Sequence, residues 1–142
     1  MTKRRVVITG LGAVSPFGVG VDKFWHSLVE GKSGITTSEL IDVSKHVVKI
    51  SGEVKNFNAE DYLDPKEAKK MDRFIQFAMI AADEAIKDAK LEEVNDVDPY
   101  KIGVIVSSAA GGFRTFEENH IRILEKGPNK CSPFTIPMMI VN

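Results

Sequence analysis

The sequence predicts an α/β fold with a largely parallel sheet. Two short β-branched runs, residues 6–8 and residues 102–106, each run into small residues and are typical of buried strands. Elsewhere, apolar residues recur at helical spacing. Buried strands that alternate with helices are typical of α/β folds, in which helices cover the faces of the sheet.

The first helix is predicted just after the first strand and its loop. Its apolar face has the spacing i, i+3, i+4, i+7 and i+8, made by Val21, Phe24, Trp25, Leu28 and Val29. Gly31 follows, where a left-handed residue commonly ends a helix. Residues 47–54 come later and could form a strand or an edge hairpin.

Two helices are predicted in the middle of the chain. Asp64 can cap a helix that has Pro65 at its first position and Glu67 where a capping box needs it. The longer helix covers about residues 72–89. Residues 77–82 are apolar on every side, so we expect burial between layers, with alanines that allow close approach.

A capping box of Thr115 and Glu118 predicts a further helix, which ends at Gly127. The last eleven residues form an apolar run that has no turn or cap after it. Because domains usually finish in polar, flexible residues, we expect the fold to continue beyond Asn142.

Composition limits the class of protein. The 142 residues are 43% apolar and 27% charged, as in soluble globular proteins. A net charge of −1 predicts no strong general affinity for nucleic acid or an anionic membrane, and no apolar segment is long enough to span a bilayer. A single cysteine fits a reducing compartment, so we expect a cytoplasmic protein.

Three kinds of chemical site are disfavoured. Gly10 and Gly12 follow a strand, but Ser15 stands where a dinucleotide fingerprint needs its third glycine. The three histidines (His26, His46 and His120) are too scattered for a metal site. Cys131 is interpreted as a structural residue, because unpaired cysteines are usually buried small hydrophobes.

A basic cluster is the best candidate for a binding site. Its members have the spacing i, i+3, i+4 and i+7 and share one face if the helix continues through Met71: Lys66, Lys69, Lys70 and Arg73. Lys126 and Lys130 form a second small group. Both groups fit either a solvated helix face or a docking surface for an acidic partner.

Several stretches resemble the beta-ketoacyl-acyl-carrier-protein synthases of fatty-acid synthesis, in order and along the whole chain. They are residues 4–18, 24–25, 31–35, 69–74, 117–120, 127–130 and 132–142. The resemblance implies a thiolase-like fold of two similar halves, stacked as αβαβα, in a homodimer. It also implies that residues 1–142 are an incomplete N-terminal portion of the first domain.

The resemblance implies a condensing reaction with no cofactor, because the substrates ride on the phosphopantetheine of acyl carrier protein. An acyl group moves to a cysteine, malonyl-carrier loses carbon dioxide, and the resulting carbanion attacks the acyl thioester. The family's catalytic cysteine, histidines and lysine would lie beyond Asn142, so no catalytic residue is assigned within this chain.

The resemblance also assigns two sets of binding residues. Carrier-docking positions are matched by Lys66, Lys69, Lys70 and Lys130, whereas Asn129 stands where a basic residue is common. Acyl-pocket positions are matched by Ala110, Phe134 and Thr135. Ala110 replaces a bulkier gating residue, so the pocket could be open to long chains, unless a neighbour such as Phe113 or Phe134 refills the space.

Two other classes of protein remain in competition. A non-catalytic relative resembling a chain-length factor would keep the frame but lack the cysteine. A nucleotide-binding oxidoreductase is disfavoured by the incomplete glycine fingerprint.

Overall fold

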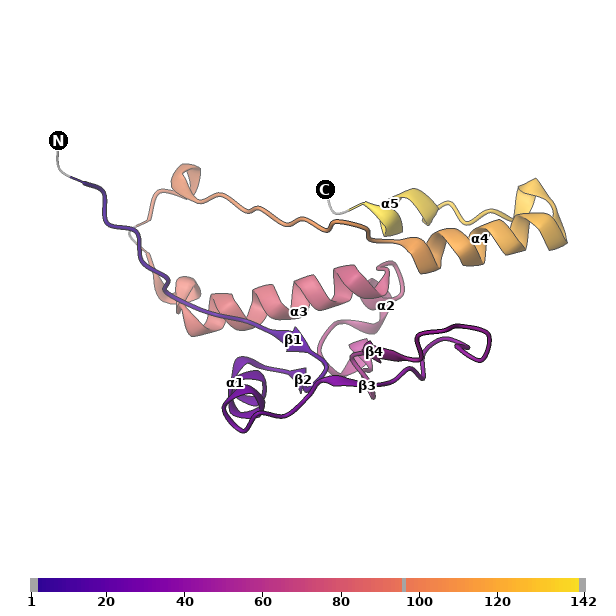
Figure 1. Ribbon diagram of the computed structural model, residues 1–142. Helices are drawn as coiled ribbons and strands as arrows, with labels where there is room; N and C mark the ends of the chain where they lie inside the picture. The colour runs from indigo at the N-terminus through magenta and orange to yellow at the C-terminus, as the bar shows by residue number, and fades with distance from the viewer. Residues whose placement is uncertain (1–2, 96, 141–142) are drawn as a thin grey trace. The chain divides into compact units, whose positions relative to one another are not determined.

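The computed structural model describes residues 3–95 and 97–140 (Figure 1). The strands are β1 (Val14–Ser15), β2 (Gly18–Val19), β3 (Ile35–Thr37) and β4 (Ile50–Gly52). The helices are α1 (Val21–Val29), α2 (Pro65–Ala68), α3 (Arg73–Asp88), α4 (Phe113–Lys126) and α5 (Thr135–Met139). Single 3-10 turns are η1 (Ala59–Asp61), η2 (Leu91–Glu93), η3 (Pro99–Lys101) and η4 (Pro128–Lys130).

The strands form two small antiparallel sheets, β1 with β2 and β3 with β4. Of the two alternatives for residues 47–54, the strand is confirmed as β4, whose partner is β3 outside that range, with Thr36 opposite Ser51. The parallel sheet is not present among the described residues. Residues 6–8 and 102–106 are extended but unpaired, with Val6 92% and Ile105 96% exposed, because a strand forms only beside a hydrogen-bonding neighbour.

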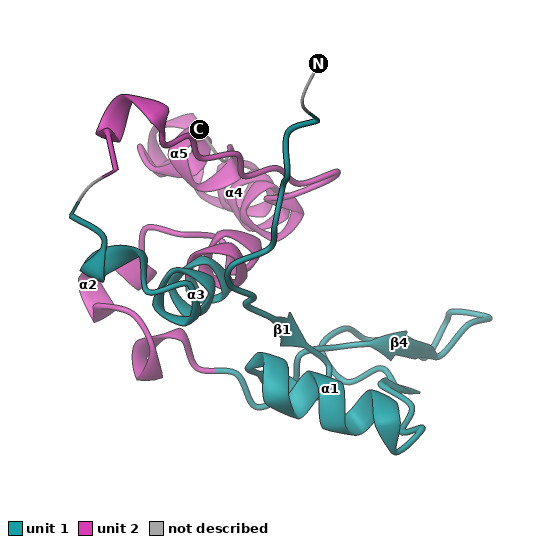
Figure 2. Ribbon diagram, turned by 90° about the vertical axis from the view of Figure 1, so that its left-hand side faces the viewer, with its two compact units in different colours: residues 1–57, 80–96 teal, residues 58–79, 97–142 magenta. Residues whose placement is uncertain are grey.

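The chain divides into two compact units, which we describe separately (Figure 2). The first contains residues 3–57 and 80–95, and the second contains residues 58–79 and 97–140. Helix α3 contributes its C-terminal part to the first unit and its N-terminal part to the second.

In the first unit, the segment before β1 lies against the backbone of α3. A Cβ atom on Gly12 would lie 1.8 Å from the carbonyl oxygen of Ala81, so only glycine fits there. The Glu84 carboxylate accepts hydrogen bonds from the backbone N–H of Ala13 at 2.9 Å and of Val21 at 2.8 Å. The prediction that the alanines of this helix allow close approach is therefore confirmed.

Most predicted helix boundaries are confirmed. Helix α1 is followed by Gly31 in the left-handed region, with φ 66°, and α3 covers nearly the whole predicted range. The expectation that residues 77–82 are buried on every side is wrong in this structure. Ile80 is buried but Met79 is 46% exposed, so α3 buries only part of its circumference.

In the second unit, α2 begins as predicted. The Asp64 carboxylate accepts from the backbone N–H groups of Lys66 and Glu67. Helix α4 ends before Gly127 as predicted, but the Thr115–Glu118 capping box is wrong. The N-cap is Gly112, with φ 75°, which places Thr115 inside the first turn, where its side chain is buried.

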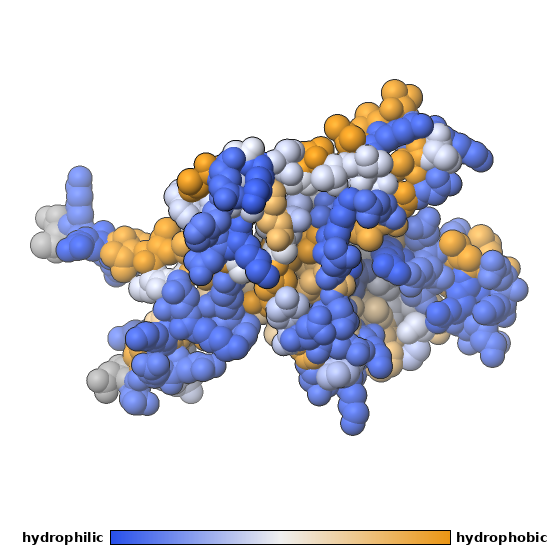
Figure 3. Space-filling model, turned by 90° about the horizontal axis from the view of Figure 1, so that it is seen from below, coloured by the Kyte–Doolittle hydropathy of each residue, from blue (hydrophilic) through white to orange (hydrophobic). Residues whose placement is uncertain are grey.

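Large apolar side chains remain exposed in both units. Figure 3 shows apolar and hydrophilic side chains interspersed on the face that it presents. Phe113 is 70% and Leu124 is 72% exposed on α4. Among the residues that the structure describes, only Ala59, Ala68 and Ile80 are buried apolar residues. Each unit therefore has a small core.

Candidate functional site

Of the lysines predicted to dock the carrier, Lys66 lies in α2, whereas Lys69 and Lys70 lie in the break between α2 and α3. Helix α2 ends at Ala68 and α3 begins at Arg73, so the single helical face predicted for the cluster is not formed. Lys66, Lys69 and Lys70 are nevertheless all exposed, within five residues of one another in the chain. The three lysines are therefore exposed on a short helix and the turn that follows it, rather than in a stripe along one long helix.

Neighbouring carboxylates balance much of the charge of this turn. The Lys69 ammonium lies 3.6 Å from the Glu60 carboxylate, and Lys70 lies 2.7 Å from Glu67. Lys66 has no ion-pair partner within residues 3–95 and 97–140. Exposed pairs of this kind contribute about 0–1 kcal/mol each, so an acidic partner can displace them at little cost.

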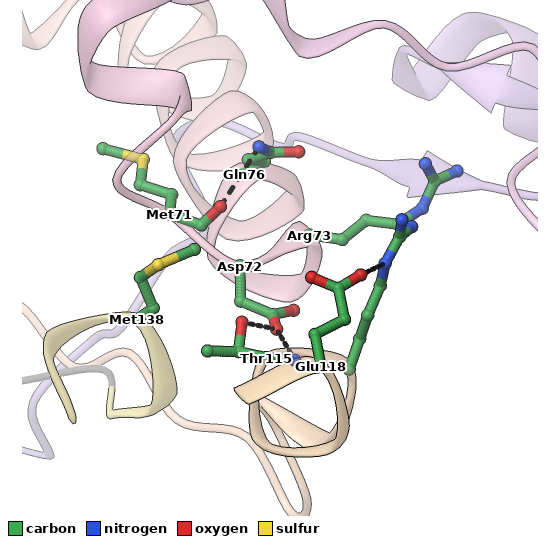
Figure 4. Close-up of a pocket in the computed structure, with 8 residues that line it drawn as sticks. Met71, Asp72, Arg73, Gln76, Thr115, Glu118 and Met138 are labelled. Atoms are coloured by element: carbon green, nitrogen blue, oxygen red, sulfur yellow. Dashed lines mark hydrogen bonds and ion pairs between the residues drawn. The ribbon is translucent and has the colours of Figure 1, made fainter. Parts of the chain in front are cut away.

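A polar cavity of about 220 Å³ lies beside this turn, between the start of α3 and the start of α4 (Figure 4). Arg73 and Arg114 line it together with the carboxylates of Asp72 and Glu118. The Arg73 guanidinium stacks over the Phe77 ring, 5.0 Å from its centroid. The cavity thus contains two positive and two negative side chains, and its charge is balanced.

The pKa values of the two arginines shift in opposite directions. Burial lowers the pKa of Arg73, and the charge of Arg114 lowers it further. The hydrogen bond between Arg114 Nε and Glu118 Oε1, 2.8 Å long, raises the pKa of Arg114. Both guanidinium groups stay charged at neutral pH, because arginine ordinarily titrates far above it.

A buried hydrogen bond joins the docking turn to α4. Asp72 Oδ2 accepts from Thr115 Oγ1 at 2.5 Å and from the Thr115 backbone N–H at 3.2 Å (Figure 4). Asp72 and Thr115 are only 7% and 5% exposed. Asp72 was not among the site residues predicted from the sequence. The available signal was its position before the first apolar turn of α3, where aspartate is a common cap.

The acyl-pocket candidates come from two segments of the second unit. Ala110 is exposed and immediately precedes Gly111, at which a Cβ atom would lie 2.4 Å from the Phe74 ring. Phe134 is 49% exposed, and Thr135 is half-buried at the first position of α5. None of these candidates lines the cavity of Figure 4.

The remaining candidates lie on the surface. Lys130 closes η4 and is exposed, as is Lys126 at the end of α4. Cys131 is also exposed, so the expectation that it is buried is wrong. Its sulfur lies 3.6 Å from Thr135 Oγ1, and it follows a 3-10 turn rather than beginning a helix.

Within residues 3–95 and 97–140, no three His, Cys, Asp or Glu side chains are grouped so that they could hold a metal ion. Over the same residues, no helix has the length and apolar character that crossing a membrane requires.

Comparison with known proteins gives a family match along nearly the whole chain. The model for the family described as "Beta-ketoacyl synthase, N-terminal domain" matches residues 3–141. The chain is 46% identical to 3-oxoacyl-[acyl-carrier-protein] synthase 2 of Synechocystis sp. over 142 residues, all of this chain and 34% of that protein. It is 48% identical to the Staphylococcus aureus synthase of the same name over 137 residues, 96% of this chain and 33% of that one. The chain therefore spans about a third of the length of these relatives.

Solved structures show the same fold at lower sequence identity. A ketosynthase in complex with its type II PKS acyl-carrier protein matches 98% of this chain and 37% of its own, with a TM-score of 0.75 and 22% identity. The ishigamide ketosynthase/chain length factor matches 98% of this chain and 34% of its own, with a TM-score of 0.77 and 24% identity. The structure therefore has the fold of part of a ketosynthase, which is thiolase-like.

Proposed function

Because this chain belongs to the beta-ketoacyl synthase family, over that family's N-terminal domain, we propose that it forms part of a condensing enzyme of fatty-acid elongation. The enzyme would transfer an acyl group from a carrier thiol to its own cysteine. Malonyl-carrier would then lose carbon dioxide, and the carbanion would attack the acyl thioester. This step forms a carbon–carbon bond, yields 3-oxoacyl-carrier and releases the cysteine thiolate.

One observation carries this proposal. Identity of 46–48% to two synthases of the same name extends over nearly the whole chain rather than over one motif. A chain-length-factor-like protein without the cysteine is the alternative, but the match to the ishigamide ketosynthase/chain length factor is only 24% identical and bears on the fold alone.

Within this enzyme, we propose that Lys66, Lys69, Lys70 and Lys130 capture the acidic carrier protein. Their exposure supports this role, as does the weakness of the ion pairs that Lys69 and Lys70 make with their neighbours. Charge complementarity of this kind mainly sets the rate and register of encounter, and salt weakens it.

We propose that Ala110, Phe134 and Thr135 line the acyl pocket. The small side chain of Ala110 would leave room for long or branched acyl chains. The alternative is that Phe113 or Phe134 turns inward and refills that space.

We further propose a cytoplasmic homodimer that needs no bound cofactor. The single cysteine of this chain fits a reducing compartment. Exposed Phe113 and Leu124 on α4 offer apolar area for subunit contact. The substrates would bring their own phosphopantetheine on the carrier.

The experiment is an assay of 3-oxoacyl-carrier formation from acyl-carrier and malonyl-carrier. The full-length protein that contains this domain should turn over, and residues 1–142 alone should not. Absence of turnover in a folded full-length protein that binds the carrier would favour the chain-length-factor alternative. Turnover by residues 1–142 would overturn the assignment of catalysis to residues outside them.

A further inference from the structure

Three buried polar side chains of the second unit form a continuous chain of hydrogen bonds. Asp72 accepts from the side chain and the backbone N–H of Thr115, at 2.5 and 3.2 Å. The Thr115 carbonyl oxygen accepts from Asn119 Nδ2 at 2.9 Å. Asn119 Oδ1 in turn accepts from the backbone N–H of Ser132 at 3.1 Å.

The chain continues from Ser132 into the start of α5. Ser132 Oγ accepts from the Phe134 backbone N–H at 3.2 Å. The Ser132 carbonyl oxygen accepts from Thr135 Oγ1 at 2.7 Å and from the Thr135 backbone N–H at 3.1 Å. Six residues from three separate segments are therefore linked without a break.

Burial makes this network a strong constraint. Asp72, Thr115 and Asn119 are 7%, 5% and 8% exposed. In the described part of the chain, no buried side-chain nitrogen or oxygen lacks a hydrogen-bond partner. A satisfied buried network fixes one arrangement, because breaking any link leaves polar groups without water or a partner.

The two ends of the network adjoin the two proposed binding regions. Asp72 follows the docking lysine Lys70 by two residues, while Phe134 and Thr135 are proposed acyl-pocket residues. A close contact also holds the segment around Asp72. Phe74, two residues after Asp72, packs against Gly111 so tightly that a Cβ atom there would lie 2.4 Å from its ring.

We infer that Asp72, Thr115 and Asn119 are positioning residues that hold the acyl-pocket residues Phe134 and Thr135 in register with the carrier-docking turn. This positioning role rests on the proposed function, whereas the mechanical link, meaning the hydrogen-bond network from Asp72 to the start of α5, does not. None of the three side chains needs to touch substrate. Their effect passes through Ser132, whose hydrogen bonds set the start of α5.

The first test measures the link without any enzymatic assay. In the full-length protein, Thr115→Val removes the hydroxyl but keeps the branched shape. It should increase hydrogen exchange at residues 132–135 about tenfold, although Thr115 makes no hydrogen bond to that segment. Thr115→Ser should restore protection. Glu118→Gln is the matched control, because it breaks the neighbouring ion pair with Arg114 outside the network.

Exchange in α1 should stay unchanged in all of these variants, which separates a local effect from general destabilisation. If Thr115→Val does not fold, Asp72→Asn is the second variant. It keeps the shape and weakens the acceptor by removing its charge, so a smaller increase is expected. Unchanged exchange at residues 132–135 in a folded variant of either kind would overturn the positioning role.

The second test concerns acyl selectivity. Thr115→Val should change the ratio of kcat/KM for long and short acyl-carriers by about tenfold, with the Kd for carrier within about twofold of wild type. Thr115→Ser should restore the ratio. An unchanged ratio would overturn the functional part of this inference. Absence of activity in the wild type would instead contradict the proposed function, while the exchange test would still decide the mechanical link.

Discussion

Gly12→Ala is expected to destabilise the first unit strongly, because the segment before β1 lies on the backbone of α3. The added Cβ would lie 1.8 Å from the carbonyl oxygen of Ala81, 2.8 Å from its carbonyl carbon and 3.0 Å from the backbone nitrogen of Ala85. These atoms belong to a hydrogen-bonded helix and cannot turn aside as a flexible side chain would. The segment itself must move away by more than about 1 Å to reach an ordinary contact distance.

The size of the stability loss follows from the contacts that this movement strains. Overpacking in a well-packed region costs about 1–3 kcal/mol, and a rigid backbone neighbour places this site at the upper end. The movement would also lengthen the 2.9 Å hydrogen bonds from the backbone N–H groups of Leu11 to Asp88 and of Ala13 to Glu84. Each such bond contributes about 1 kcal/mol, so the expected loss is roughly 3–5 kcal/mol.

Urea unfolding followed by the fluorescence of Trp25, the single tryptophan of this chain, measures the loss. Gly103→Ala is the matched control. A Cβ atom at that position would have no neighbour within 4 Å, so the change should be neutral or stabilising by up to about 1 kcal/mol. If Gly12→Ala lies within about 0.5 kcal/mol of wild type, the close packing on α3 is refuted.

Three further predictions concern docking, selectivity and pH. Replacing Lys66, Lys69 and Lys70 together with glutamate should raise the apparent KM for acyl-carrier at least about tenfold but leave a small thioester substrate nearly unaffected; equal losses would mean a structural role. Ala110→Ile should lower kcat/KM for long acyl chains at least about tenfold and spare short ones, and an unchanged profile would exclude it from the pocket. Hydrogen bonds, chiefly from the Ser38 hydroxyl and then from the Glu39 backbone, lower the pKa of Glu53 from 4.5 to about 2. The stabilising effect of the Glu53 carboxylate should therefore be complete above about pH 4.5 and be lost as the pH falls towards 2. The difference in unfolding free energy between wild type and Glu53→Gln should shrink over that window. A constant difference would contradict the assignment.

Local signals in the sequence were sufficient for the helix ends. Asp64 caps α2, Gly31 follows α1 with a positive φ, and Gly127 ends α4, because each acts on residues within one turn of itself. The error at Thr115 has the opposite cause, a contact with a distant part of the chain. The residue lies three before a glutamate, as a capping box requires, but its hydroxyl bonds to Asp72, 43 residues away.

The sequence pattern could not predict the features that depend on contacts between distant parts of the chain. Residues 6–8 and 102–106 have strand composition, but a strand also needs a partner at hydrogen-bonding distance, and neither segment has one among the described residues. The lysine cluster was expected to share one helical face if the helix continued through Met71, and spacing alone does not reveal the break after Ala68. The family resemblance, in contrast, is confirmed over residues 3–141, because it rests on many positions in register.

Covalent acylation of the full-length protein tests the proposed function most directly. After incubation with acyl-carrier alone, intact mass should increase by one acyl group, and peptide mapping should place the thioester on a cysteine outside residues 1–142. Omitting malonyl-carrier stops the reaction at this step, so the acyl-enzyme should accumulate. Acylation of Cys131, or no acylation in a folded protein that binds the carrier, would contradict the account.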